Sequence, residues 1–209
     1  MKRLISLTTA GAALWLLSAC NGILDGISDE PDNVNNTGTG FENEGEIFID
    51  ATSYTQWVYI DFSEQSIVTL GYDEDAPQNW DIAVHRYDVK TNGAKVVETN
   101  YSDFDQAITA TIDEADLVSD IWTTNQIVID MSTMMDGYLG YTESYYNPEL
   151  SKWLNVDTST MPPIYTPSGK VYIVYLPDGT RAGVKLLNFM NDMQVKGYMT
   201  IQYMYPFNH

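Results

Sequence analysis

Apolar and polar residues alternate along most of the chain after residue 45, and such two-residue alternation is typical of half-buried β-strands. The same stretches are rich in β-branched and aromatic residues, which favour strands. The pattern predicts strands over residues 45–52, 56–62, 66–72, 79–89, 94–101, 126–132, 170–176, 181–190 and 197–207.

Signals for helices are few. Asn147 as a cap, followed by Pro148 at the first helical position, predicts a helix over residues 147–156. Short helical turns are expected at 113–118 and 191–196, and hairpin-type turns at 91–93 (TNG) and 177–180 (PDGT). The predicted fold class is therefore all-β, mostly antiparallel, with a few short helices in a single domain.

The first twenty residues have a different character. Lys2 and Arg3 precede an apolar stretch, residues 4–17, that is too short to span a bilayer. The letters LSAC at 17–20 resemble a bacterial lipobox, in which a peptidase cuts before a cysteine that carries lipid, and an acylated Cys20 would anchor the protein outside the cytoplasm. We therefore expect a signal peptide (1–19), a flexible Gly/Asn/Asp-rich tether (20–44) and a folded domain (45–209).

Charge and residue content exclude several classes of function. The 209 residues include 29 acidic and 10 basic side chains, a formal net charge of −19, which disfavours binding to nucleic acid. One cysteine and two histidines exclude Cys/His zinc sites and an internal disulfide. No catalytic motif is present, and His85, within a regular strand, is expected to be a hydrogen-bonded structural histidine.

Methionines occur at unusual positions. Met134 and Met135 follow a predicted strand in DMSTMMDGYLGY, and Met161 stands before two prolines in STMPPIY; Met131 lies within the predicted strand and is expected in the core. Spacing alone favours methionines that fill gaps in the packing. The alternative is a set of thioethers presented to a soft metal, either haem iron or Cu(I), although the dense methionine runs typical of copper sites are absent.

Three stretches together resemble the HmuY family of haem-binding lipoproteins from Bacteroidetes. They are WDIAVHRYDVKTNGA (80–94), the segment from IVIDMS to PPIY (127–165), and the ending from LLNFMN to MYPF (186–207). The resemblance implies a hand-shaped, mostly-β domain whose loops grip one haem between two axial side chains. Some members use two histidines, a pair that His85 and the terminal His209 cannot form, and others use two methionines.

The bis-methionine pattern implies that Met134 and Met161 ligate the haem iron, with Met135 as a close alternative to Met134. Tyr138 is expected beside the haem. Lys152, Tyr54 and Tyr138 are the candidate partners of its propionates.

The resemblance further implies a haemophore without enzymatic activity. It would be anchored by lipid in the outer membrane, exposed at the cell surface or released from it. The protein would capture haem from host haemoproteins and deliver it to a TonB-dependent outer-membrane receptor. A lipid-anchored glycan-binding or adhesion module is the alternative, because exposed tyrosine and tryptophan rings on a β scaffold also stack on sugars.

Overall fold

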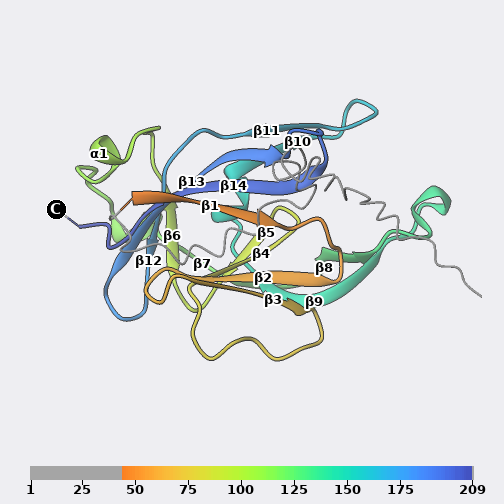
Figure 1. Ribbon diagram of the computed structural model, residues 1–209, viewed down its shortest axis with the longest axis horizontal. Helices are drawn as coiled ribbons and strands as arrows, with labels where there is room; N and C mark the ends of the chain where they lie inside the picture. Colours follow the sequence, from red (N-terminus) through yellow and green to blue (C-terminus); the bar gives the residue numbers. More distant parts are fainter. Residues whose placement is uncertain (1–43, 209) are drawn as a thin grey trace, which may run out of the picture. The chain divides into compact units, whose positions relative to one another are not determined.

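The computed structural model describes residues 44–208, and most regular elements in this range are β-strands (Figure 1). All strand pairs are antiparallel. Between residues 44 and 208, no helix is long and apolar enough to cross a membrane. The prediction of a mostly antiparallel all-β fold with short helices is confirmed. The predicted signal peptide (1–19), Cys20 and the tether up to residue 43 lie outside the described residues.

The larger sheet has six strands. In β14 (Lys196–Met204), buried and half-buried residues alternate at every position, as a sheet with one face against the core requires. In spatial order the strands are β1 (Glu44–Asp50), β14 (Lys196–Met204), β13 (Arg181–Met190), β12 (Tyr172–Tyr175), β6 (Lys95–Glu98) and β7 (Val118–Ser119).

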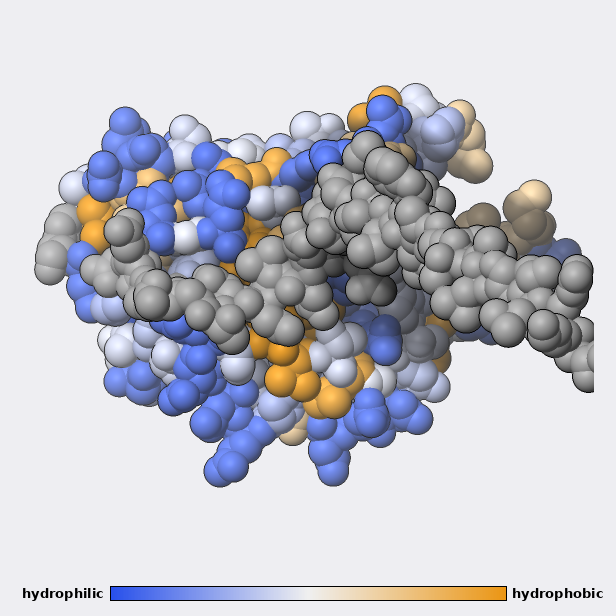
Figure 2. All heavy atoms as spheres, viewed as in Figure 1, coloured by the Kyte–Doolittle hydropathy of each residue, from blue (hydrophilic) through white to orange (hydrophobic). Residues whose placement is uncertain are grey.

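The smaller sheet has four strands. In spatial order they are β3 (Ser66–Gly71), β2 (Gln56–Asp61), β4 (Ile82–His85) and β5 (Asp88–Thr91). The edge strand β3 is largely exposed: Ile67 is 45% and Val68 38% accessible. Figure 2 shows a hydrophobic area over this strand on an otherwise largely hydrophilic face.

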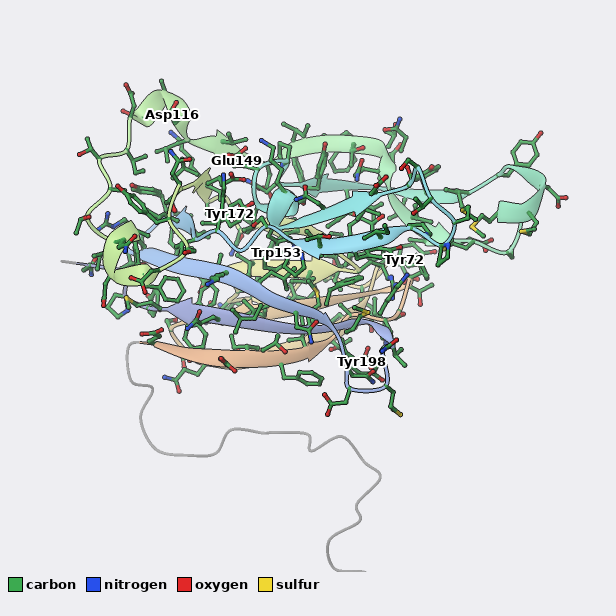
Figure 3. All side chains as sticks on the ribbon, turned by 90° about the horizontal axis from the view of Figure 1, so that it is seen from above. Tyr72, Asp116, Glu149, Trp153, Tyr172 and Tyr198 are labelled. Carbon is green, nitrogen blue, oxygen red and sulfur yellow. The ribbon has the colours of Figure 1, made fainter. Side chains whose placement is uncertain are left out.

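The main core contains residues of both sheets. Ile60 and Val84 of the smaller sheet and Val184 and Ile201 of the larger sheet belong to one cluster of buried side chains. Trp153 joins the same cluster and is fully buried (Figure 3). Removal of this apolar surface from water is the main favourable contribution to folding.

Two hairpins form separate two-stranded sheets. The first pairs β8 (Ile121–Asp130) with β9 (Gly140–Tyr146), and the second pairs β10 (Leu154–Asp157) with β11 (Ile164–Pro167). The helical elements are all of one turn or little more: α1 (Phe104–Ala107), η1 (Glu114–Asp116), η2 (Met134–Asp136) and η3 (Leu150–Trp153).

The prediction of one strand over residues 79–89 is wrong. The chain forms two strands there, β4 and β5, joined by a tight turn at Arg86, whose φ is +55°. The Arg86 guanidinium donates to the backbone oxygens of Ala51 (3.3 Å) and Thr52 (2.6 Å). These bonds stabilise a backbone conformation that residues other than glycine rarely adopt.

Three further local predictions need correction. The turn at 91–93 closes no hairpin, because β5 pairs with β4 whereas β6 pairs with β12 and β7; the chain crosses there from one sheet to the other. The helix predicted over 147–156 is only η3, since residues from Leu154 onward pair as β10, although Asn147 Oδ1 does accept the Leu150 N–H (2.8 Å). Residues 191–196 form the turn of the β13–β14 hairpin and no helix.

Candidate functional site

The β8–β9 hairpin is fixed at its base to the smaller sheet. Ile127 is fully buried against Trp57 and Tyr59. Gln126 Nε2 donates to Asp88 Oδ1 at 2.9 Å. Burial raises the pKa of Asp88 to about 6, and the bond from Gln126 opposes this rise. The base of the hairpin is therefore packed and hydrogen-bonded, while its distal turn carries the candidate methionines.

The distal turn of this hairpin is ordered by its own backbone. The Gly137 N–H donates to the Met134 carbonyl oxygen at 3.0 Å, and Gly137 adopts φ +85°, which favours glycine. The Tyr138 N–H donates to the Thr133 carbonyl oxygen (3.2 Å), and Thr133 Oγ1 donates back to the Tyr138 carbonyl oxygen (3.3 Å). These bonds close the short helix η2 into a defined turn.

The side chains of this turn face solvent. Met135 is 91% and Tyr138 72% exposed, and Met134, the first residue of η2, is 45% exposed. Met131 is half-buried and lies just after β8 ends at Asp130, so its predicted place in a core strand is wrong.

The β10–β11 hairpin is fixed by Trp153. The indole N–H of Trp153 donates to the Tyr87 carbonyl oxygen (3.1 Å), and its own carbonyl oxygen accepts the Ser168 N–H (2.7 Å). Val156 and Tyr165 on the two strands pack against the main core. The base of the second hairpin is thus as firmly held as that of the first.

The connection between β10 and β11, residues 158–163, carries Met161. The Ser159 N–H donates to Asp157 Oδ1 (2.8 Å), and Thr160 Oγ1 donates to the Pro162 carbonyl oxygen (3.1 Å). The Met161 side chain is 88% exposed. The interpretation of these methionines as gap-fillers is therefore wrong for Met135 and Met161, which fill no gap in the core.

Both methionine-bearing turns lie at the same end of the folded part, on the right in Figures 1 and 3. Figure 2 shows hydrophobic side chains at both turns. The described residues contain no cluster of three or more His, Cys, Asp or Glu side chains that could hold a metal ion. The thioethers of Met134, Met135 and Met161 are donors of a kind that suits a soft metal such as haem iron.

His85 has the structural role expected of it. Its side chain is 1% exposed, and Nε2 lies 2.8 Å from the Tyr54 carbonyl oxygen, to which it donates. Burial lowers the pKa of His85, which favours the neutral imidazole.

The structure changes the set of candidate partners for an anionic ligand. Lys152, one of the predicted propionate partners, is paired with Glu149 (2.6 Å), and Tyr54 lies under the Arg86 guanidinium (4.6 Å to the ring centroid). Sequence reasoning missed Lys196, whose Nζ donates to the Pro163 carbonyl oxygen at 3.3 Å. The sequence does not reveal this contact, because the two partners are 33 positions apart in the chain.

The chain is similar to several known proteins. The family model described as HmuY protein matches residues 53–203. A protein of Bacteroides vulgatus ATCC 8482, named as HmuY-like and haem-binding, is 54% identical in sequence to this chain, and its structure matches with a TM-score of 0.75. The match covers 80% of this chain and 94% of the Bacteroides vulgatus chain. A protein of Bacteroides fragilis NCTC 9343, named as a lipoprotein, is 49% identical with a TM-score of 0.73 and coverages of 78% and 90%.

A more distant structure has the same fold. The apo form of a HmuY analogue from Tannerella forsythia is 24% identical with a TM-score of 0.66, covering 77% of this chain and 94% of its own. No curated protein matches this chain. The family match extends over most of the folded part, from β2 to β14. The chain therefore belongs to the HmuY family, whose members bind haem and are not enzymes.

Proposed function

We propose that this protein binds haem between its two methionine-bearing turns, η2 and residues 158–163. One observation carries the proposal: in a member of a haem-binding family, exposed thioethers stand on two separate turns at one end of the fold. Both turns are held by packed hairpin bases, so the thioethers are presented on defined supports. Defined positions reduce the ordering that ligand binding would otherwise require.

Met134 and Met161 are the proposed axial ligands of the iron. Met134 is less exposed than its neighbour Met135, 45% against 91%, and its backbone is fixed within η2, so Met135 is the alternative ligand. Neutral thioethers stabilise Fe(II) relative to Fe(III). The protein should therefore bind ferrous haem more tightly than ferric haem.

The proposed cellular role is that of a haemophore. Cys20 would carry the lipid that holds the protein to the outer membrane, and the similar protein from Bacteroides fragilis is named as a lipoprotein. Haem would be captured from host haemoproteins and passed to a TonB-dependent receptor in the same membrane. This role needs no catalytic group.

The test is a spectrophotometric titration with haemin, with and without dithionite. Met134→Ala and Met161→Ala should each remove the low-spin spectrum of the reduced complex. Met193→Ala is the matched control, since Met193 is also exposed (79%) but lies in the β13–β14 turn. An unchanged spectrum in the Met134, Met135 and Met161 variants alike would refute the assignment of ligands.

One observation favours a second candidate function, glycan binding. Trp122 and Tyr145 lie opposite each other on β8 and β9, with ring centroids 5.0 Å apart, and are 53% and 54% exposed. Exposed aromatic rings of this kind stack on sugars. A glycan array compared between the wild type and Trp122→Ala tests this function, and a wild type that binds haem but no glycan rejects it.

A further inference from the structure

A cation beside the carboxylates of a bound porphyrin would strengthen binding through charge-assisted hydrogen bonds, and this chain offers few cations. Of its 10 basic residues, Lys2 and Arg3 precede the described part, which leaves 10 − 2 = 8. The β8–β9 hairpin, residues 121–146, contains three acidic residues and no basic one. The β10–β11 hairpin, residues 154–167, contains Asp157 and no basic residue. A cation for the proposed site must therefore come from another element.

Three of the eight are already paired with carboxylates. Lys95 lies 3.7 Å from Glu114, Lys152 is paired with Glu149, and Lys170 with Glu98. Recruiting any of them for a ligand would break an existing ion pair.

Four others are occupied within the fold or lie far from the two turns. Arg86 is bonded to backbone oxygens, and Lys90 lies over the Trp57 ring (4.1 Å to the centroid) and donates to Tyr59. Lys185 donates to the Ser102 carbonyl oxygen at 2.7 Å. Arg181 begins β13, and Met190, which pairs with Lys196, ends it nine residues later. Nine residues of a strand span about 30 Å, so Arg181 lies far from the second turn.

Lys196 remains, and it lies against the second turn. Its Nζ donates to the Pro163 carbonyl oxygen (3.3 Å) and stands 4.3 Å from the centroid of the Tyr165 ring. Tyr165 in turn stacks on Phe189, with ring centroids 5.2 Å apart. The Lys196 ammonium group has three N–H donors, and among the described residues only the Pro163 carbonyl oxygen accepts from it, so donors remain for a ligand. Lys196 is half-buried and forms no ion pair there.

We propose that Lys196 binds a propionate carboxylate of the porphyrin held between the two turns. The proposal rests on the proposed function, and it makes Lys196 a residue that selects dicarboxylate porphyrins. Pro163 stands two residues after Met161, so the ammonium group is fixed beside the turn that supplies an axial ligand. The aromatic ring beneath it keeps the charge at this position without neutralising it.

The experiment compares haemin with haemin dimethyl ester, which lacks the two carboxylate charges. Both ligands are titrated spectrophotometrically under dithionite into the wild type, Lys196→Met and Lys196→Arg, at low salt. Lys196→Met should lower the preference for the free acid by about fivefold, the size of a half-exposed ion pair. Lys196→Arg should retain most of the preference, and added salt should reduce it in the wild type.

Lys152→Met is the matched control, because it removes the same charge from a lysine that is paired with Glu149. This variant should keep the wild-type preference. If Lys196→Met weakens both ligands equally, Lys196 only supports the turn through Pro163, and the proposal is overturned. An unchanged preference in Lys196→Met overturns it as well. A wild type that binds neither ligand refutes haem binding itself, which is a different result.

Discussion

Replacing Trp153 by phenylalanine tests how much this residue, which lies directly before the second methionine-bearing hairpin, contributes to the stability of the fold. Trp153 ends η3, is fully buried in the main core, and donates its indole N–H to the Tyr87 carbonyl oxygen. Phenylalanine retains an aromatic ring but has no donor and less volume. The substitution therefore removes one buried hydrogen bond and leaves a small cavity directly before β10.

The expected loss is the sum of these two changes. A buried carbonyl oxygen that loses its partner costs about 1–2 kcal/mol. The missing part of the indole ring adds about 1 kcal/mol of lost packing. The free energy of unfolding should thus fall by about 2–3 kcal/mol, a large part of the roughly 5–15 kcal/mol typical of a domain. Trp153→Ala, with its larger cavity, should cost about 3–5 kcal/mol.

Urea unfolding followed by circular dichroism measures this loss. With a slope of about 2–3 kcal/mol per molar urea, Trp153→Phe should lower the midpoint by roughly 1 M. Trp122→Phe is the matched control, because Trp122 is 53% exposed and its indole N–H makes no hydrogen bond among the described residues. Its midpoint should change by less than about 0.3 M. Equal shifts in the two variants would refute the idea that burial and the bond to Tyr87 make Trp153 important.

Three other predictions follow from the same structure. Gly183→Ala should destabilise the fold by about 1–3 kcal/mol, because the added Cβ would lie 2.7 Å from a ring carbon of the buried Phe207; an unchanged urea midpoint would contradict this packing. Burial raises the pKa of Asp88 to about 6, so the wild type should lose stability as pH rises from about 4 through 6. Asp88→Asn should reduce that loss, of which the buried Asp81 contributes another part, and should gain about 1–2 kcal/mol at pH 7, whereas Asp75→Asn, at an exposed carboxylate, should retain the wild-type pH profile of urea unfolding. Hydrogen peroxide should oxidise the exposed Met161 and abolish the haem spectrum, with recovery after treatment by methionine sulfoxide reductase; a haem spectrum that survives oxidation, verified by mass spectrometry, would exclude Met161 as a ligand.

The strands that could be predicted are those whose pattern is local. The alternation over 197–207 predicts β14, and the turn at 177–180 predicts the β12–β13 hairpin. Both signals lie within a few consecutive residues, as the two-residue period of a half-buried strand does. The tight turn at Arg86 has no such signature. Its positive φ is stabilised by bonds to backbone oxygens more than thirty residues away, and the local sequence lacks the glycine or asparagine typical of hairpins.

The passage of the chain from one sheet to the other likewise depends on contacts between distant residues and not on a local pattern. A turn at 91–93 is visible in the sequence, but whether it closes a hairpin depends on which strands lie next to β5 and β6 in space. Asp120 accepts the Thr91 N–H (2.7 Å), and Asn147 donates its side-chain amide to Asp120 (3.0 Å). These contacts span about thirty residues and join β5 to distant segments instead of to β6. No window of consecutive residues carries that information.

For the candidate site, residue type and backbone setting together carry more information than spacing. Met199 lies on the buried face of β14 and is fully buried, as a gap-filling methionine should be, whereas Met135 and Met161 stand in glycine- or proline-containing turns and are 91% and 88% exposed. Side chains this exposed bury little apolar surface and contribute little to the stability of the fold. The proposed haem site gives the thioethers on two separate turns at one end of the molecule a role, since haem iron takes soft donors. Lys196, the proposed partner of the ligand's charge, comes from a third element, and only the folded structure brings it beside Pro163.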